Sequence, residues 1–288
     1  SIKELYRIGT GPSSSHTMGP RKAAEIFLER HPEATAFKVT LYGSLAATGK
    51  GHMTNIAITE VLQPVAPVEI IWEPKIFLPF HPNGMKFVSV DKEGKETDQW
   101  VVFSIGGGAL AEESDGASSV NTPDVYSMNS MTEILQWCER TGKSYWEYVK
   151  ECEDSDIWDY LQEVWKTMQN AVKRGLEQEG VLPGPLNLRR KASTYYIRAS
   201  GYKQSLQSRG LVFAYALAVS EENASGGVIV TAPTCGSCGV MPAVLYHLAK
   251  SREFSDTRIL RALATAGLVG NIVKTNASIS GAEVGCQG

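Results

Sequence analysis

The feature that most constrains the fold of this 288-residue chain is a single change in its hydrophobic pattern. Ahead of residues 112–129, short apolar runs alternate with polar residues, which is typical of half-buried strands. Beyond them, apolar residues recur at helical spacing. Residues 112–129, EESDGASSVNTPDVYSMN, are polar and lack periodicity, as expected of a connection between domains. We predict an α+β domain at 1–120, a linker at 121–129 and a mainly α-helical domain at 130–288.

Composition and charge exclude several classes of partner. The chain is 43% hydrophobic and 20% charged, and its net charge of -3 is mixed in sign along the sequence, so it has no basic field for nucleic acid or an anionic membrane. Leu211 to Val219, the longest apolar run, is far short of the roughly 20 residues that a membrane span needs. The first residues, SIKELYRIG, lack the pattern of a signal peptide. We expect a cytoplasmic protein with a small-molecule substrate, whose five cysteines stay reduced or bind metal.

The first domain is expected to contain four strands and two helices. Phe37, Val39 and Leu41 alternate with polar residues, and DKEGKET at 91–97 is a charged hairpin turn. The segment GSLAATGKGHMTN, residues 43–55, is predicted to be a glycine-rich loop that opens a helix. We predict strands at 37–41, 68–72, 85–90 and 99–105, a helix at 20–30, and a strand end at the three glycines 106–108.

The second domain is expected to be built from helices. Ser130 and Glu133 form a capping box ahead of a helix that would bury Cys138 and end at Gly142. Further helices are predicted from residue 157 to near 180, and at 211–220, 240–250 and 260–274. The basic run at 189–191 could bind a substrate carboxylate, but a solvated charge run is the favoured interpretation.

A loop rich in hydroxyl groups, GTGPSSSHTMGP at residues 9–20, leads into the first helix. It holds Ser13, Ser14, Ser15 and Thr17 around His16, a combination suited to holding a carboxylate or moving a proton. The alternative is a serine that caps the helix beside an exposed histidine, and the residues alone favour that alternative.

The second candidate site is a pair of cysteines, Cys235 and Cys238, on a glycine-rich turn between the strand-like run at 228–230 and a helix. The positive end of a helix dipole favours a thiolate, so metal binding and redox chemistry are both open. The same spacing also occurs in structural zinc sites, in redox pairs and in inert buried thiols, and the spacing alone favours inert thiols.

Several longer motifs resemble those of the iron-sulfur L-serine dehydratases. EENASGG at 221–227, TAPTCGSCGVMPAVL at 231–245 and NASISGAEVGCQG at 276–288 resemble the catalytic domain of that family, and GPSSSHTMGP at 11–20 resembles its other domain. The resemblance implies a lyase that converts L-serine to pyruvate and ammonia, acting in amino-acid degradation and gluconeogenesis. It also implies the single-polypeptide form, a 4Fe-4S cluster as Lewis acid and a homodimer.

The resemblance implies roles for individual residues. Ser13, Ser15, His16 and Thr17 would bind or help deprotonate the substrate, and His52 would belong to the domain's framework or pocket rim, the alternative being a solvated loop histidine. Cysteine ligands of the cluster would be Cys238 and Cys286. Family members often have asparagine where Cys235 stands, so it would be a ligand or a neighbour of one. Asn276, Ser278 and Ser280 could line the same pocket. The identity of the base and the choice between serine and threonine stay open.

The family pattern places a third cysteine ligand beyond Gly288, so the resemblance implies a catalytic domain that is incomplete at its C-terminus. We expect the 288-residue chain to fold, to bind little cluster and to show no dehydratase activity. A form extended through that cysteine should bind the cluster and be active.

Two alternatives come from other functional classes. One is a non-catalytic serine-binding or regulatory relative, which would bind serine without turnover. The other is a thiol oxidoreductase that uses Cys235 and Cys238, which would form a reversible disulfide and contain no iron. The iron content of protein prepared without oxygen separates both from the dehydratase.

Overall fold

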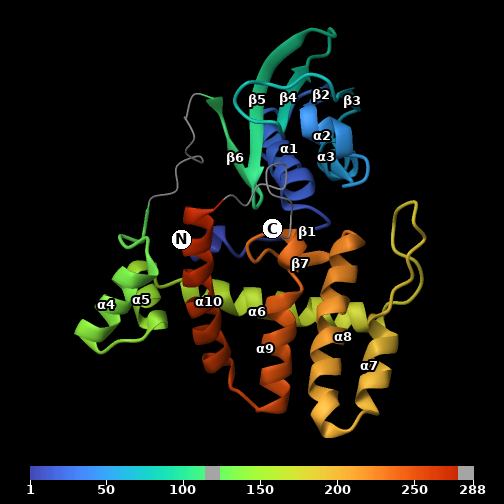
Figure 1. Ribbon diagram of the computed structural model, residues 1–288. Coiled ribbons are helices and arrows are strands. Elements are labelled where there is room, and N and C mark those ends of the chain that lie inside the picture. Colours follow the sequence, from blue (N-terminus) through green and yellow to red (C-terminus); the bar gives the residue numbers. More distant parts are fainter. Residues whose placement is uncertain (114–123, 278–288) are drawn as a thin grey trace. The chain divides into compact units, whose positions relative to one another are not determined.

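The structure is a computed structural model that describes residues 1–113 and 124–277 (Figure 1). The described residues form two compact units. The α/β unit contains residues 12–113, and the helical unit contains Ser1–Gly11 together with residues 124–277. This confirms the predicted fold class, an N-terminal region with a mixed sheet followed by a mainly helical region.

The α/β unit is organised around a five-stranded sheet with the strand order β3-β2-β4-β5-β6. Strands β2 and β3 are parallel, and the other neighbours are antiparallel. All four strands predicted for this domain are present. The bounds are β2 (Ala36–Tyr42), β3 (Val68–Glu73), β4 (Gly84–Val90), β5 (Glu96–Gly106) and β6 (Ala109–Ala111).

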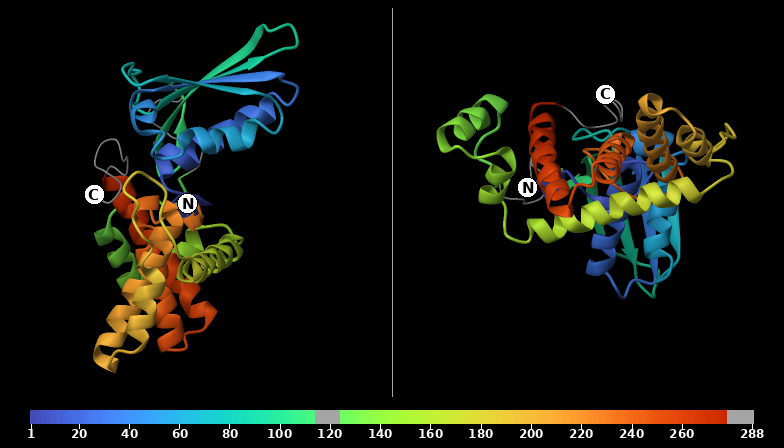
Figure 2. Two further views of the ribbon diagram at one scale, coloured as in Figure 1. Left: turned by 90° about the vertical axis from the view of Figure 1, so that its right-hand side faces the viewer. Right: turned by 90° about the horizontal axis from the view of Figure 1, so that it is seen from below.

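One face of this sheet is covered by helices, which Figure 2 shows in its left view. They are α1 (Gly19–Arg30), α2 (Gly43–Thr48) and α3 (Thr54–Leu62). Buried and half-buried residues alternate along β2, so one set of its side chains packs under these helices. The core includes Ala23, Phe27, Phe37, Val39, Leu41, Leu45, Ile58, Leu62, Met85, Phe87 and Val102.

The predicted loop at 43–55 is wrong, because most of this segment is helical. Gly43 begins α2 with a φ of +49°, and a Cβ there would lie 2.7 Å from the carbonyl oxygen of Pro82. The glycine therefore marks a close backbone approach at the start of a helix, where the sequence suggested an extended loop. Only Gly49–Met53, between α2 and α3, is non-helical.

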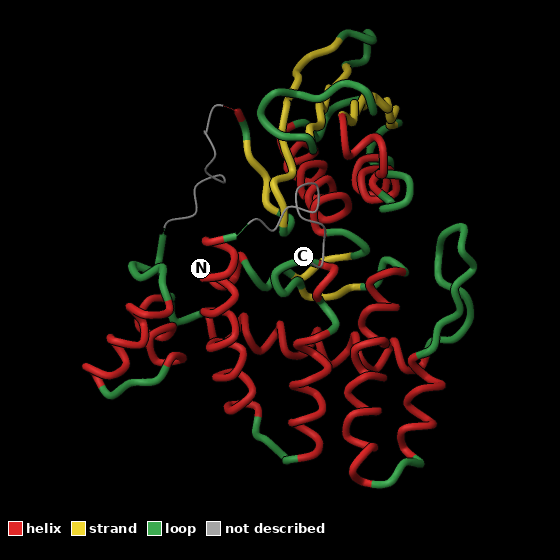
Figure 3. The backbone as a smooth tube through the Cα atoms, viewed as in Figure 1, coloured by secondary structure: helices red, strands yellow, loops and turns green. Residues whose placement is uncertain are grey.

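The helical unit is assembled along α6 (Ile157–Glu177), which packs against four other helices. In the right view of Figure 2, α6 runs across the helices that follow it in the chain, and Figure 3 shows how helix dominates this unit. The other helices are α4 (Met131–Thr141), α5 (Tyr145–Cys152), α7 (Ala192–Ser200), α8 (Gln204–Ala224), α9 (Val240–Ser251) and α10 (Asp256–Asn276). None of the helices in the described ranges is long and apolar enough to cross a membrane.

The capping box at Ser130 and Glu133 is confirmed, and Gly142 ends α4 with a φ of +71°. The prediction that Cys138 is a core residue is wrong, because its side chain is only half-buried. Ile134 and Trp137 form the buried face of this short helix instead.

The first residues of the chain are an integral part of the helical unit. β1 (Ile8–Thr10) pairs antiparallel with β7 (Val228–Val230). Ile2 and Tyr6 are fully buried, and the Tyr6 hydroxyl donates to the carbonyl oxygen of Leu263 at 2.9 Å. Hydrogen bonds and apolar burial therefore both attach this segment to the helices.

Candidate functional site

The hydroxyl-rich loop is a buried π-helical turn, η2 (Ser14–Met18), directly ahead of α1. Ser13 caps the turn, since its hydroxyl accepts the backbone N–H of His16 at 3.1 Å. The Thr17 hydroxyl donates to the carbonyl oxygen of His52 at 2.7 Å. The side chains of residues 13–17 are all buried. The residues alone favoured a capping serine beside an exposed histidine; the cap is present, but the histidine is 5% exposed.

His16 is held by hydroxyl groups at both ring nitrogens. Its Nδ1 lies 2.9 Å from the Ser15 hydroxyl, and its Nε2 lies 3.2 Å from the Ser44 hydroxyl. Burial, and then the neighbouring His52, lower the pKa of His16 from 6.5 to about 4. The ring is therefore neutral near pH 7 and able to accept a proton.

His52 is next to His16, with the two ring centroids 4.7 Å apart. Its Nδ1 lies 3.0 Å from the carbonyl oxygen of Thr48. Of the two interpretations of His52, the geometry fits a place in the framework around His16 better than a solvated loop. Ser44 was not predicted as a site residue, and it comes from the segment that the sequence assigned to a loop.

Three buried side-chain atoms in the described part of the α/β unit have no hydrogen-bond partner. One is His31 Nε2, which lies 3.0 Å from an Asp98 carboxylate oxygen, and the other two are the Ser104 hydroxyl and the Asn83 side-chain oxygen. Two hydrogen bonds join these last two residues: the side-chain Nδ2 of Asn83 donates to the Ser104 carbonyl oxygen at 3.1 Å, and the backbone N–H of Ser104 donates to the Asn83 carbonyl oxygen at 3.0 Å. A Cβ at Gly19 would lie 2.2 Å from the Ser104 hydroxyl, so Ser104 adjoins the end of η2. No sequence motif pointed to Asn83 or Ser104, because nothing in a strand pattern shows which hydroxyl will lack a partner.

The cysteine turn is η4 (Cys235–Ser237), between β7 and α9, as the sequence predicted. Cys235 and Cys238 are each 1% exposed. Gly239 follows them, and a Cβ there would lie 2.8 Å from the carbonyl oxygen of Ala216 on α8. The turn is therefore packed tightly against a neighbouring helix.

Burial raises the pKa of the Cys238 thiol to about 12. A thiolate at this position would need a nearby positive charge, such as a metal ion or an iron-sulfur cluster, to be stable at neutral pH. The described residues contain no group of three or more His, Cys, Asp or Glu side chains that could hold a metal ion. Cys286, Ser278 and Ser280 lie outside the described residues. The buried thiols thus fit part of a cluster-binding set.

Asn276 is the last residue of α10 and is exposed. Its side-chain amide donates to the carbonyl oxygens of Asn129, at 3.2 Å, and Ile272, at 2.8 Å. Both bonds are donated by the side-chain nitrogen and hold the helix end. The predicted role of Asn276 in a pocket stays a prediction.

The motif EENASGG supports the helical unit through two buried carboxylates. Glu221 accepts the backbone N–H of Lys191 at 2.6 Å, at the start of α7. Glu222 is bound by Arg174 and Arg190, each at 3.0 Å. The favoured interpretation of the basic run as solvated is therefore wrong for Arg190, whose side chain is 9% exposed and pairs with a buried carboxylate.

Comparison with known proteins identifies the family. The serine dehydratase beta chain family matches residues 1–71, and the serine dehydratase alpha chain family matches residues 82–288. The chain is 36% identical to an L-serine dehydratase of Haemophilus influenzae, over 100% of this chain and 75% of the relative. It is 37% identical to L-serine dehydratase 1 of Escherichia coli, with 100% and 75% covered, and 35% identical to an L-serine dehydratase of Streptomyces coelicolor, with 100% and 74% covered. This chain belongs to the L-serine dehydratase family.

Proposed function

We propose that this protein is a lyase that deaminates L-serine to pyruvate and ammonia by dehydration. The observation that carries the proposal is the buried, neutral His16 with a serine hydroxyl at each ring nitrogen, in a chain whose relatives are named L-serine dehydratases. Dehydration of serine requires removal of a weakly acidic α-proton and loss of hydroxide, which is a poor leaving group. A neutral imidazole is suited to the proton transfer.

The hydroxyl-rich loop is assigned to the substrate. The hydroxyls of Ser13, Ser15 and Thr17 would bind the substrate's carboxylate or amino group, and His16 would take or relay a proton at its ring nitrogen. The hydroxyl partners of His16 orient the ring, and its burial excludes water from it. Asn276 and Ser278 are assigned to substrate contacts.

The cysteines are assigned to a 4Fe-4S cluster. Cys238 and Cys286 would be ligands, and Cys235 would be a ligand or would support Cys238 from the same turn. When bound, a cluster with one open iron supplies a Lewis acid for the departing β-hydroxyl. The packed glycine-rich turn would shield the thiolates from water.

The other parts of the functional picture are proposals of the same kind. We place the protein in the cytoplasm, in amino-acid degradation and gluconeogenesis, and as a homodimer.

The proposal is tested on protein reconstituted anaerobically with iron and sulfide, in the 288-residue form and in a form extended through the further cysteine that the family pattern implies. Iron content, visible absorbance and pyruvate formation from serine are measured. In the extended form, Cys238→Ser should remove most iron and all turnover, while Cys138→Ser, which changes a half-buried thiol of α4, should keep both. In the same form, His16→Ala should lower turnover by about 100-fold or more with iron retained, and His31→Ala should leave turnover unchanged.

The outcomes separate the alternatives. Serine binding without pyruvate in cluster-loaded protein would support a regulatory relative. A reversible disulfide between Cys235 and Cys238 without iron would support a thiol oxidoreductase. Equal effects of His16→Ala and His31→Ala in cluster-loaded protein would contradict the role of the loop.

A further inference from the structure

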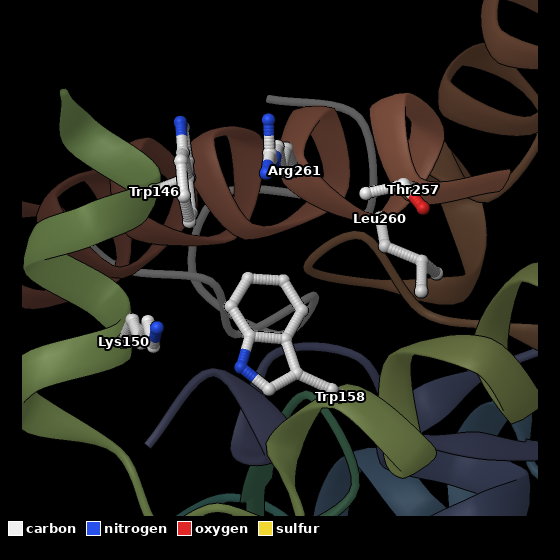
Figure 4. Close-up of a pocket in the computed structure, with 6 residues that line it drawn as sticks. All are labelled: Trp146, Lys150, Trp158, Thr257, Leu260 and Arg261. Carbon is white, nitrogen blue, oxygen red and sulfur yellow. The ribbon is translucent and has the colours of Figure 1, made fainter. Parts of the chain in front are cut away.

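The helical unit contains a cavity of about 300 Å³ that the proposed reaction does not use. It lies between α5, the start of α6 and the first turns of α10. Figure 4 shows the lining side chains arranged around a common space. They are Trp146, Lys150, Trp158, Thr257, Leu260 and Arg261. A volume of this size is at the lower end of the range for small-molecule sites.

The charged residues of this cavity are both cations. Lys150 and Arg261 have no ion pair with any residue in the described part of the chain. The acidic residues nearest to Lys150 in sequence have other partners: Glu147 accepts the backbone N–H of Ser144, and Glu151 pairs with Lys143. Two positive charges therefore lie on the same cavity, and no carboxylate within residues 1–113 and 124–277 forms an ion pair with either.

The walls of the cavity are aromatic. The rings of Trp146 and Trp158 are 6.2 Å apart and nearly perpendicular, at 71°. Neither indole N–H makes a hydrogen bond to a described residue. The central guanidinium carbon of Arg261 lies 4.1 Å from the ring centre of Trp146, a cation–π contact. A guanidinium carries five N–H donors, and those of Arg261 make no hydrogen bond to a described residue, so they are available to an acceptor.

We propose that this cavity binds a small organic anion with a flat aromatic body, such as an aromatic carboxylate. The ring would pack on Trp158 and Leu260, and the acidic group would accept hydrogen bonds from Arg261 and Lys150. An inorganic anion would leave the indole walls without contacts. A neutral aromatic molecule would leave both cations without a partner.

The test uses 2-naphthoate as the probe and isothermal titration calorimetry on the purified chain. Neutral 2-naphthylmethanol and acetate, which has no ring, are the comparison ligands. We expect one saturable site for 2-naphthoate and binding at least about tenfold weaker for each comparison ligand, since each loses one of the two kinds of contact. The probe should also raise the melting temperature.

Substitutions connect the binding to this cavity. Arg261→Ala and Trp158→Ala should each weaken 2-naphthoate binding by about tenfold or more, and Trp158→Phe should retain most of it. The matched control is Arg258→Ala, because Arg258 lies on the same helix and stacks on Phe254 outside the cavity. The melting temperature without probe reports whether each variant is folded.

Three results would overturn the proposal. They are the absence of saturable 2-naphthoate binding, equal binding of the neutral alcohol, and an equal loss in the Arg258→Ala and Arg261→Ala variants. Because the assay needs no cluster and no serine turnover, its outcome is independent of the proposed dehydratase activity.

Discussion

At the scale of single residues, His16 shows how burial changes the chemistry of a side chain. The sequence identified His16 and its neighbouring hydroxyls, but from the residues alone it favoured an exposed ring. Ser44 and His52 create the enclosed setting, and they come from a helix and a turn 28 and 36 residues along the chain. A local motif therefore predicted the group and could not predict its environment, since desolvation depends on tertiary contacts.

The lowered pKa of His16 predicts a pH dependence of stability. The unfolded chain binds a proton at His16 near pH 6.5, whereas the folded chain does so only near pH 4. Stability should therefore fall as the pH drops from 6.5 to 4, by up to about 1.4 kcal/mol per pH unit from this residue. Urea unfolding at several pH values in this window gives the free energy of unfolding as a function of pH. This free energy should change less steeply with pH for His16→Gln than for the unchanged chain.

The control for this measurement is His247→Gln, because His247 is partly exposed and contacts the Ser208 hydroxyl on the surface of the helical unit. Its slope should match that of the unchanged chain. A His16→Gln slope equal to the unchanged one would show that His16 is not desolvated as described.

At the scale of elements, the hydrophobic period predicted the elements with a strong local pattern, but it could not predict pairing between strands far apart in the sequence. The strand β2 and the helix α6 have strong local patterns, so the sequence predicted both. Strands β1 and β7 are three residues each and pair across more than 200 positions, which no local pattern records. The helix α2 was missed because glycine and threonine, typical of turns, stand at its ends.

The contact between α6 and α8 predicts an unusual response to a glycine substitution. Alanine normally stabilises a helix interior by about 1 kcal/mol relative to glycine. At Gly175, however, the added Cβ would lie 2.2 Å from the backbone oxygen of Ala218, and backbone of a buried helix cannot move aside easily. We expect Gly175→Ala to lower the free energy of unfolding by about 2 kcal/mol or more.

Chemical unfolding followed by circular dichroism measures this effect. Gly201→Ala is the control, since the nearest atom to a Cβ there is the Arg198 oxygen at 3.6 Å, an ordinary contact. It should change stability by less than about 0.5 kcal/mol. A neutral or stabilising Gly175→Ala would contradict the close packing of α6 on α8.

At the scale of the whole molecule, chain order and structural units differ. The family comparison assigns residues 1–71 to one family and 82–288 to another. In the structure, Ser1–Gly11 cluster with the helical unit, and the chain enters the α/β unit at Pro12. Composition could not predict that the first eleven residues belong to the helical unit, because a short buried segment has a similar composition whichever unit it packs against. The predicted domain limits at 120 and 130 stay predictions.

This arrangement predicts the behaviour of a chain cut between its units. The polar stretch 112–129 should be the first site of limited proteolysis, leaving two folded pieces. Because the N-terminal piece still carries Ile2, Tyr6 and β1, which are held by the helical unit, the two pieces should stay together in native size-exclusion chromatography. They should separate only in denaturant. A protease recognition site inserted within 112–129 makes the cut uniform.

The N-terminal anchor can then be removed by one substitution. Tyr6→Asp would place a charge where the ring is 1% exposed and its hydroxyl is bonded to Leu263, so the cut pieces should elute separately. Tyr202→Asp, at a position that is 48% exposed, is the matched control and should leave them together. Separation of the unsubstituted pieces would show that the first eleven residues do not hold to the helical unit in solution. Co-elution of the Tyr6→Asp pieces would show that contacts other than this segment join them.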